Sequence, residues 1–97
     1  MAEVKVMYWR EIPYAVRATD TNGRASRNLP DRFQEAVDAA AMAAGATAME
    51  SYQAGFVWGP SEDRTGSAAE AADSMVAELV AGYPAERLKE LVSKITS

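Results

Sequence analysis

An Asn-Gly pair at residues 22 and 23 separates two short segments of strand character. Both residue types tolerate the positive φ angles of a two-residue hairpin turn, so the pair is a strong signal for antiparallel strand pairing. We predict that Tyr14–Asp20 pairs with Arg24–Asn28 across this turn. The second segment is short and polar, which suits the edge of a sheet, where charge discourages pairing with another chain.

Another strand is predicted at Glu3–Arg10, where residues alternate with a period of two and include β-branched and aromatic types. Both of its faces carry apolar groups, which favours a central position in the sheet. We expect Ile12-Pro13 to end this strand, because proline lacks an N–H for the ladder and restricts the residue before it.

Three helices are expected from helical spacing of apolar residues. The first opens at Leu29-Pro30-Asp31, either with Asp31 as a cap partnered by Gln34 or with Pro30 at the first helical position, and it ends at Gly45. Ser67 and Glu70 form a capping box for the second helix, which Gly82 ends. Pro84 begins the third, and the last two helices are predicted to form an αα-hairpin about the Gly82-Tyr83-Pro84 corner.

The segment between these helices allows two interpretations. Glu50–Trp58 alternates as a fourth strand does, whereas a helical turn through Ala48–Gln53 competes with it. Ser61–Gly66 is predicted to be a loop, because it is polar and ends in glycine. With a strand at Glu50–Trp58, the element order is β-β-β-α-β-α-α. We therefore predict one α+β domain over residues 1–97, with a small, mostly antiparallel sheet and helices on one face.

The 97-residue sequence contains neither cysteine nor histidine. Thiolate chemistry is thereby excluded, and the usual general base and commonest metal ligand are missing. We expect no enzyme activity, no cofactor and no metal site; the alternatives left open are an enzyme that uses Glu, Asp, Tyr or Lys and a magnesium or calcium site made of carboxylates alone. The net charge of −4 weighs against nucleic-acid binding. The chain has no signal-peptide pattern and no apolar run long enough to span a membrane, so a cytoplasmic location and no membrane contact are expected.

Candidate binding residues gather in two aromatic motifs and one group of arginines. Tyr8-Trp9-Arg10 ends the first strand, and Trp58 precedes Gly59-Pro60. If both tryptophans share a sheet face, they form an aromatic platform for a planar ligand or a partner protein; the alternative is that they are core residues. The arginines bind carboxylate or phosphate if the hairpin brings Arg17 near Arg27; the alternative is a solvated edge. The group is Arg10, Arg17, Arg24, Arg27 and Arg32.

Other ionisable groups carry weaker signals. Glu35 and Asp38 are one helical turn apart, as are Glu70 and Asp73, which is the spacing that two-carboxylate chemistry needs. The same spacing is common on any acidic helix, so we interpret both pairs as solvated. Lys5 has apolar neighbours, which would depress its pKa if it were buried; a solvated lysine is the simpler interpretation.

Several motifs occur together in the first two-thirds of the chain. They are Tyr8-Trp9-Arg10-Glu11-Ile12-Pro13, the segments 29–38 and 40–45, and Tyr52 followed by Trp58-Gly59-Pro60. Together they resemble the small bacterial "virulence factor" domain family, which is related to the N-terminal module of conserved virulence factor C. The resemblance runs from Val4 to about Pro60, and the C-terminal helices match only in character. Relatives in this family often lie beside genes for corrinoid- and folate-linked methyl transfer.

The family is named for a phenotype, so the resemblance supplies no catalytic residues. It implies an accessory subunit of one-carbon or demethylation enzymes. We therefore expect a non-catalytic accessory or protein-interaction domain that binds a protein partner, such as an enzyme subunit. The alternative is a carrier of a small anionic aromatic ligand, such as a folate. A homodimer formed by edge-strand pairing is also plausible for so small a sheet. The expected contact residues are Tyr8, Trp9, Arg10, Arg17, Arg27, Arg32 and Trp58.

Overall fold

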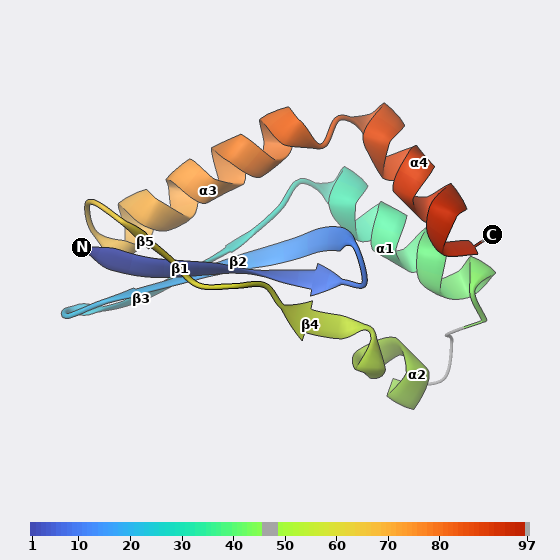
Figure 1. Ribbon diagram of the computed structural model, residues 1–97, viewed down its shortest axis with the longest axis horizontal. Coiled ribbons are helices and arrows are strands. Elements are labelled where there is room, and N and C mark those ends of the chain that lie inside the picture. Colours follow the sequence, from blue (N-terminus) through green and yellow to red (C-terminus); the bar gives the residue numbers. More distant parts are fainter. Residues whose placement is uncertain (46–48, 97) are drawn as a thin grey trace.

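The computed structural model describes residues 1–45 and 49–96, which form an antiparallel sheet of five strands and four helices. Three of the helices, α1, α3 and α4, lie on one side of the sheet, as Figure 1 shows. The predicted fold class, α+β with helices on one face, is confirmed. The strands are β1 Ala2–Trp9, β2 Ile12–Asp20, β3 Gly23–Asn28, β4 Phe56–Trp58 and β5 Glu62–Arg64, and the helices are α1 Asp31–Ala43, α2 Met49–Ala54, α3 Ala68–Gly82 and α4 Ala85–Thr96.

Strand β1 is the centre of the sheet, as predicted. It pairs with β2 on one side, and on the other with β5 along its first half and β4 along its second half. The strand order is β3-β2-β1-β4, so β3 is an edge strand. The predicted hairpin forms at Asn22-Gly23, but its two turn residues are Thr21 and Asn22, because Asp20 pairs with Gly23, the first residue of β3. Asn22 does not adopt the positive φ expected of an Asn-Gly turn. Pairing of two copies along β3 stays a prediction.

Strand β2 begins at Ile12, two residues before the predicted start at Tyr14, and it contains Pro13. The register explains how the proline is accommodated. Met7 pairs with Ala15 but Tyr8 pairs with Pro13, so Tyr14 is an extra residue in a β-bulge. A bulge already interrupts the ladder, and the missing N–H of proline therefore costs little there.

The chain between the first and third helices was only partly predicted. The helical alternative holds for α2, which begins at Met49, and only Phe56–Trp58 forms β4. Ala48 lies outside the described residues. The segment predicted to be a loop contains β5, which pairs with the N-terminal half of β1. The side chains of β5 show no alternation typical of a strand, so the strand was not predicted. It forms because it pairs with β1, and not because its residues have a high β-strand propensity.

The helix ends follow the sequence in part. Helix α1 begins after Pro30 without a side-chain cap, so neither the Asp31 cap nor Pro30 at the first helical position is correct. Gly45 follows its C-terminus with φ +75°, a left-handed conformation that suits glycine. Ser67 and Glu70 form the predicted capping box of α3.

The predicted αα-hairpin is wrong, because α4 packs against α1 after the corner at Tyr83 (Figure 1). An arginine fixes this arrangement. Arg32 of α1 donates through Nη2 to the carbonyl oxygens of Val80 and Tyr83, at 3.1 and 3.3 Å. These carbonyls lie at the C-terminal end of α3, where the helix leaves acceptors without intrahelical partners and favours a cation.

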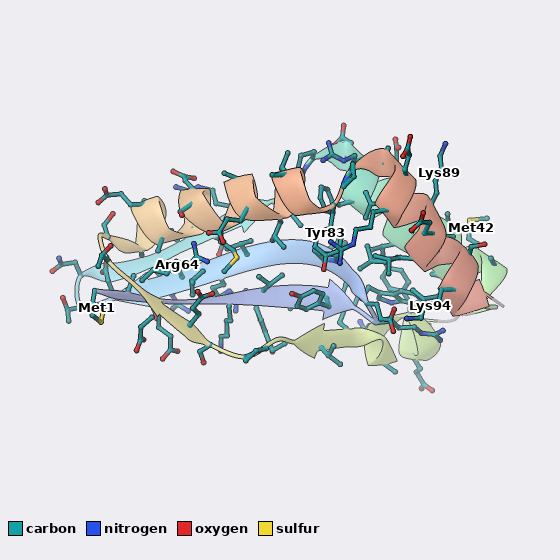
Figure 2. The ribbon with its side chains drawn as sticks, turned by 45° about the horizontal axis from the view of Figure 1, so that its top comes forward. Met1, Met42, Arg64, Tyr83, Lys89 and Lys94 are labelled. Atoms are coloured by element: carbon teal, nitrogen blue, oxygen red, sulfur yellow. The ribbon has the colours of Figure 1, made fainter. Side chains whose placement is uncertain are left out.

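A second arginine holds β5 to α3. Arg64 forms ion pairs with Glu62 and Glu78 and donates to the Ser74 hydroxyl at 3.1 Å. Figure 2 shows Arg64 between the strand and the helix. The hydrogen bonds and charge of Arg64 lower the pKa of Glu78 below its usual value. The polar residues of the predicted loop therefore attach it to the helix.

The core lies between the sheet and the helices. The alternating residues of β1 and β2 that face the helices are buried, and so are one side each of α1 and α3. The largest fully buried side chains are Trp9, Phe33, Ile12, Val4, Val16, Val37 and Pro13.

Asp20 joins the hairpin to the start of α3, and we expect the stability that it contributes to depend on pH. Its carboxylate accepts from the backbone N–H groups of Ala68 and Asn22, both at 2.7 Å. These bonds lower the pKa of Asp20 in the folded chain. A lowered folded-state pKa contributes stability above the unfolded-state pKa of about 3.9, and this contribution is lost as the pH falls through the folded-state pKa.

Asp20→Asn is therefore expected to lower the urea midpoint at pH 7, and the difference from the parent should shrink below about pH 3.9. Urea titrations followed by circular dichroism at pH 7 and pH 2.5 measure it. Asp63→Asn is the control, since Asp63 forms no hydrogen bond or ion pair within the described residues. A difference that is equal at both pH values would contradict the assignment.

Candidate functional site

The sheet face opposite α1, α3 and α4 is the candidate site. Cross-strand neighbours project to the same side, so the register shows which residues share this face. We call it the open face. It carries Glu3, Lys5 and Met7 of β1, Ala15, Arg17 and Thr19 of β2, Arg24, Ser26 and Asn28 of β3, Trp58 of β4 and Asp63 of β5.

Trp58 lies on the open face with 41% of its surface exposed. The Lys5 ammonium nitrogen is 5.0 Å from the centre of its ring, and the Arg17 guanidinium carbon is 5.1 Å from it. Both distances are within the range of cation–π attraction. The indole therefore lies against two cations while a large part of it contacts solvent.

Within the described part of the chain, the cations of the open face have no anionic partners. Lys5 and Arg17 are directly opposite one another on β1 and β2, a like-charge pair that destabilises a sheet. Arg24 is two residues along β3 from the position opposite Arg17. Among residues 1–45 and 49–96, no carboxylate forms an ion pair with any of these three side chains. In a chain of net charge −4, this leaves a local positive surface.

An aromatic hollow adjoins Trp58. It has a volume of about 580 Å³ and is lined by Met7, Tyr14, Tyr52, Gln53 and Phe56. The ring of Phe56 meets those of Tyr14 and Tyr52 edge-on, with centroids 4.9 and 5.2 Å apart. Met7 is the cross-strand partner of Trp58, so the hollow and the tryptophan are continuous.

Tyr52 is the polar group of the hollow. Its hydroxyl donates to the Asp38 carboxylate of α1 at 3.4 Å. Burial, and next the nearby charge of Asp38, raise the pKa of Tyr52. The phenol therefore stays protonated at neutral pH and is not a general base.

Trp9 is a core residue, as the alternative interpretation held. It is fully buried, and its indole N–H donates to the backbone carbonyl of Tyr52 at 2.8 Å. The platform of two exposed tryptophans therefore does not form. Arg10 is exposed, has φ +56°, and stacks 4.8 Å from the Trp9 ring. Tyr8 is half-buried on the opposite side of β1, where burial, and next Tyr83, raise its pKa.

The expected approach of Arg17 to Arg27 is wrong. Arg27 pairs with Val16, and Ser26 is opposite Arg17. Since side chains alternate along a strand, the offset of one residue directs Arg27 to the helix side, where it forms an ion pair with Asp73 at 2.8 Å. Arg32 binds the end of α3 as described above.

Of the expected contact residues, the open face therefore presents Arg17 and Trp58. Lys5 and Met7 also contribute to this surface and were not predicted as contact residues. The period of two along β1 places both on one face, but the register that puts Lys5 opposite Arg17 depends on the β1–β2 turn and on the bulge beside Pro13, which were not predicted. The hollow was not predictable, because its lining depends on α2.

The carboxylate pairs have structural roles. Glu70 accepts from the Ser67 N–H in the capping box, Asp73 pairs with Arg27, and Asp38 accepts from Tyr52. Within the described residues, no group of three acidic side chains converges as a metal site would require.

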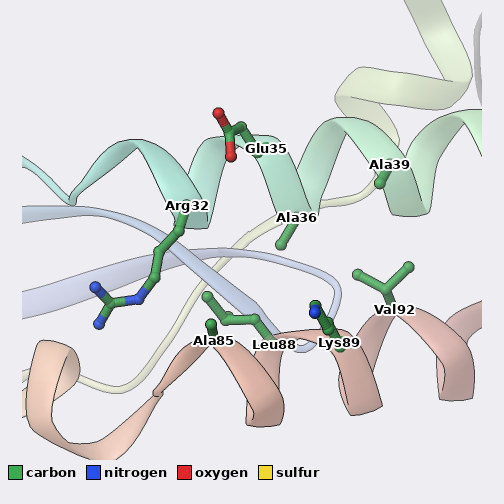
Figure 3. Close-up of a pocket in the computed structure, with 8 residues that line it drawn as sticks. All are labelled: Arg32, Glu35, Ala36, Ala39, Ala85, Leu88, Lys89 and Val92. Carbon is green, nitrogen blue, oxygen red and sulfur yellow. The ribbon is translucent and has the colours of Figure 1, made fainter.

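A groove between α1 and α4 is a second concave surface, with a volume of about 330 Å³. Figure 3 shows Ala36 and Leu88 pointing toward one another across it, whereas Glu35 points away from α4. The floor is apolar and the rim carries charges of both signs, so the chemistry of this groove selects no particular ligand. Its lining residues are Arg32, Glu35, Ala36, Ala39, Ala85, Leu88, Lys89 and Val92.

Comparison with family models gives a match to "Virulence factor" over residues 7–92. The chain belongs to this family. The match begins within β1 and ends within α4, so the virulence factor family includes the C-terminal helices as well as the sheet. No curated protein and no solved structure matches the chain. Of the helices in the described part of this family member, none is long and apolar enough to cross a membrane.

Proposed function

We propose that this virulence factor domain is a non-catalytic accessory domain that binds a partner protein through its open face. The observation that carries the proposal is the exposed Trp58, which lies against Lys5 and Arg17 on the sheet face opposite α1, α3 and α4. Neither cation forms an ion pair within the described chain. Tryptophan and arginine are the residues most often found at binding hot spots. We further propose, from the family resemblance, that the partner is an enzyme subunit of one-carbon or demethylation chemistry.

Energetics supports a binding role for this face. The like-charged Lys5–Arg17 pair is unfavourable for the sheet, and the exposed aromatic surface gains nothing from folding. Both features become favourable when an acidic and partly apolar surface covers them. Lys5, Arg17 and Trp58, by contrast, are not among the buried residues of the core.

A carrier of a small anionic aromatic ligand is the second candidate. The hollow favours it, because its volume of about 580 Å³ lies within the usual range of about 300–1,000 Å³ for small-molecule sites. Arg17 and Lys5 would then hold the carboxylates of the ligand. The hollow is shallow and open to solvent, however, and a partner's side chain fills such a surface equally well.

Affinity capture of the tagged chain from native cell extract, followed by mass spectrometry, tests the proposed function. We expect a stoichiometric protein partner with the parent, and its recovery should fall at least about tenfold with Trp58→Ala, the loss of one hot-spot contact. Met42→Ala is the matched control, because Met42 is 71% exposed on α1, away from the open face (Figure 2). A partner recovered equally by all three chains would contradict docking through Trp58.

A further inference from the structure

The geometry points to the chemistry of the bound segment: we infer that the open face binds an acidic peptide segment carrying one bulky apolar side chain. This inference rests on the proposed function and specifies what the partner presents. Carboxylates of the segment contact Lys5, Arg17 and Arg24, and the apolar side chain enters the aromatic hollow beside Met7.

Charge selects the acidic part of the segment. The three cations are exposed or half-buried on one face, and within the described chain none forms an ion pair with a carboxylate. The other arginines on the strands are satisfied differently: Arg27 is paired with Asp73, and Arg64 is paired with two glutamates. The contrast shows that unpaired arginine is not a general property of this sheet. Guanidinium groups bind carboxylates through paired hydrogen bonds, which an acidic segment supplies.

The hollow selects the apolar anchor. Its rings come from three elements, Tyr14 on β2, Tyr52 on α2 and Phe56 on β4, and they leave an opening of about 580 Å³ with Met7 at its side. A bulky apolar side chain buries aromatic surface there at little cost, since Tyr52 already has Asp38 as its hydrogen-bond partner. Because Met7 is opposite Trp58, the anchor and the carboxylates belong to one short segment.

The same surface is poorly suited to a nucleic acid or a lipid headgroup layer. Three cations lie on it, Glu3 and Asp63 are on the same face, and the whole chain carries a net charge of −4. A long polyanion or an extended anionic surface contacts the acidic remainder of the molecule as well, which repels it. A short segment contacts the cations alone.

The test uses two capped synthetic peptides that differ only in charge, one with a central phenylalanine between glutamates and one with glutamines in their place. Titrations into the ¹⁵N-labelled full chain are followed by amide chemical shifts. We expect the acidic peptide to shift the amides of Lys5, Arg17, Trp58 and Phe56. The acidic peptide should bind more tightly than the glutamine peptide. The double variant with Lys5→Glu and Arg17→Glu should bind the acidic peptide more weakly, on the order of tenfold.

Three outcomes would overturn the inference: equal binding of the two peptides, shifts confined to the groove between α1 and α4, or tighter binding of a single-stranded oligonucleotide or of anionic phospholipid vesicles. The charge-reversal variant replaces one like-charge pair on the open face by another, so it should remain folded, which its circular dichroism spectrum checks. Different results would contradict the proposed function and the inference. A captured partner that depends on Trp58 but is not displaced by the acidic peptide supports the function and refutes the inference, whereas a partner indifferent to Trp58 refutes the function.

Discussion

Replacing Trp9 with alanine is expected to lower the free energy of unfolding by about 3–5 kcal/mol, which is a large share of the stability of a small domain. Trp9 is fully buried, so its loss leaves a cavity among the residues that join β1 to α2. The truncation also removes the indole N–H, and the Tyr52 carbonyl that accepts from it loses its bond of 2.8 Å. Urea denaturation followed by far-ultraviolet circular dichroism measures the change.

Trp58→Ala is the matched control, because it removes the same side chain from the open face of the same sheet. With 41% of its surface exposed, Trp58 should contribute no more than about 1 kcal/mol, mainly through its contacts with Lys5 and Arg17. A loss at Trp58 as large as that at Trp9 would mean that the open face is part of the stable fold and not a free binding surface.

The local elements of this fold follow from short-range sequence signals. The alternation along β1, the β2–β3 hairpin and the Ser67–Glu70 capping box each act over a few residues, and each was predicted, although the hairpin turns at Thr21-Asn22. The segments that were missed depend on distant partners. Strand β5 forms by pairing with β1, and α4 leaves the corner at Tyr83 to pack on α1, because Arg32 has bonded the last carbonyls of α3.

The residues of the candidate site also divide into those that the sequence predicted and those that depend on distant contacts. Sequence placed Arg17 and Trp58 among the contact residues, and the structure puts both on the open face. The sequence could not show which of the two tryptophans is buried, since the burial of Trp9 depends on α2 and on Gly55, which covers its ring. The sequence also could not predict on which face of the sheet the Arg27 side chain lies. A hairpin signal predicts the turn, but the face that is buried depends on which side of the sheet the helices cover.

Gly55→Ala is expected to destabilise the chain by about 1–3 kcal/mol, because a methyl group at this position overlaps the Trp9 ring. A Cβ built on Gly55 lies 2.5 Å from Nε1 and 2.6 Å from Cε2 of Trp9, well inside van der Waals contact. The indole cannot move aside, since it is fully buried and bonded to Tyr52. The Gly55 carbonyl also accepts from the Arg10 N–H at 2.8 Å, so the backbone is held from both sides. Thermal unfolding followed by circular dichroism measures the loss.

Gly82→Ala provides the control, as the same substitution at a position where no heavy atom lies within 4 Å of the added Cβ. Gly82 is the last residue of α3, and alanine there restricts the unfolded chain and suits the helix, so we expect a gain of about 0.4–1 kcal/mol. If the two glycine substitutions changed the stability of the chain in opposite directions, the result would show that the close approach of Gly55 to Trp9 holds α2 and β4 against β1. If Gly55→Ala proved neutral, the Trp9 ring would have room to shift, and the wall of the aromatic hollow formed by Tyr52 and Phe56 would not be rigid enough to select an anchor side chain.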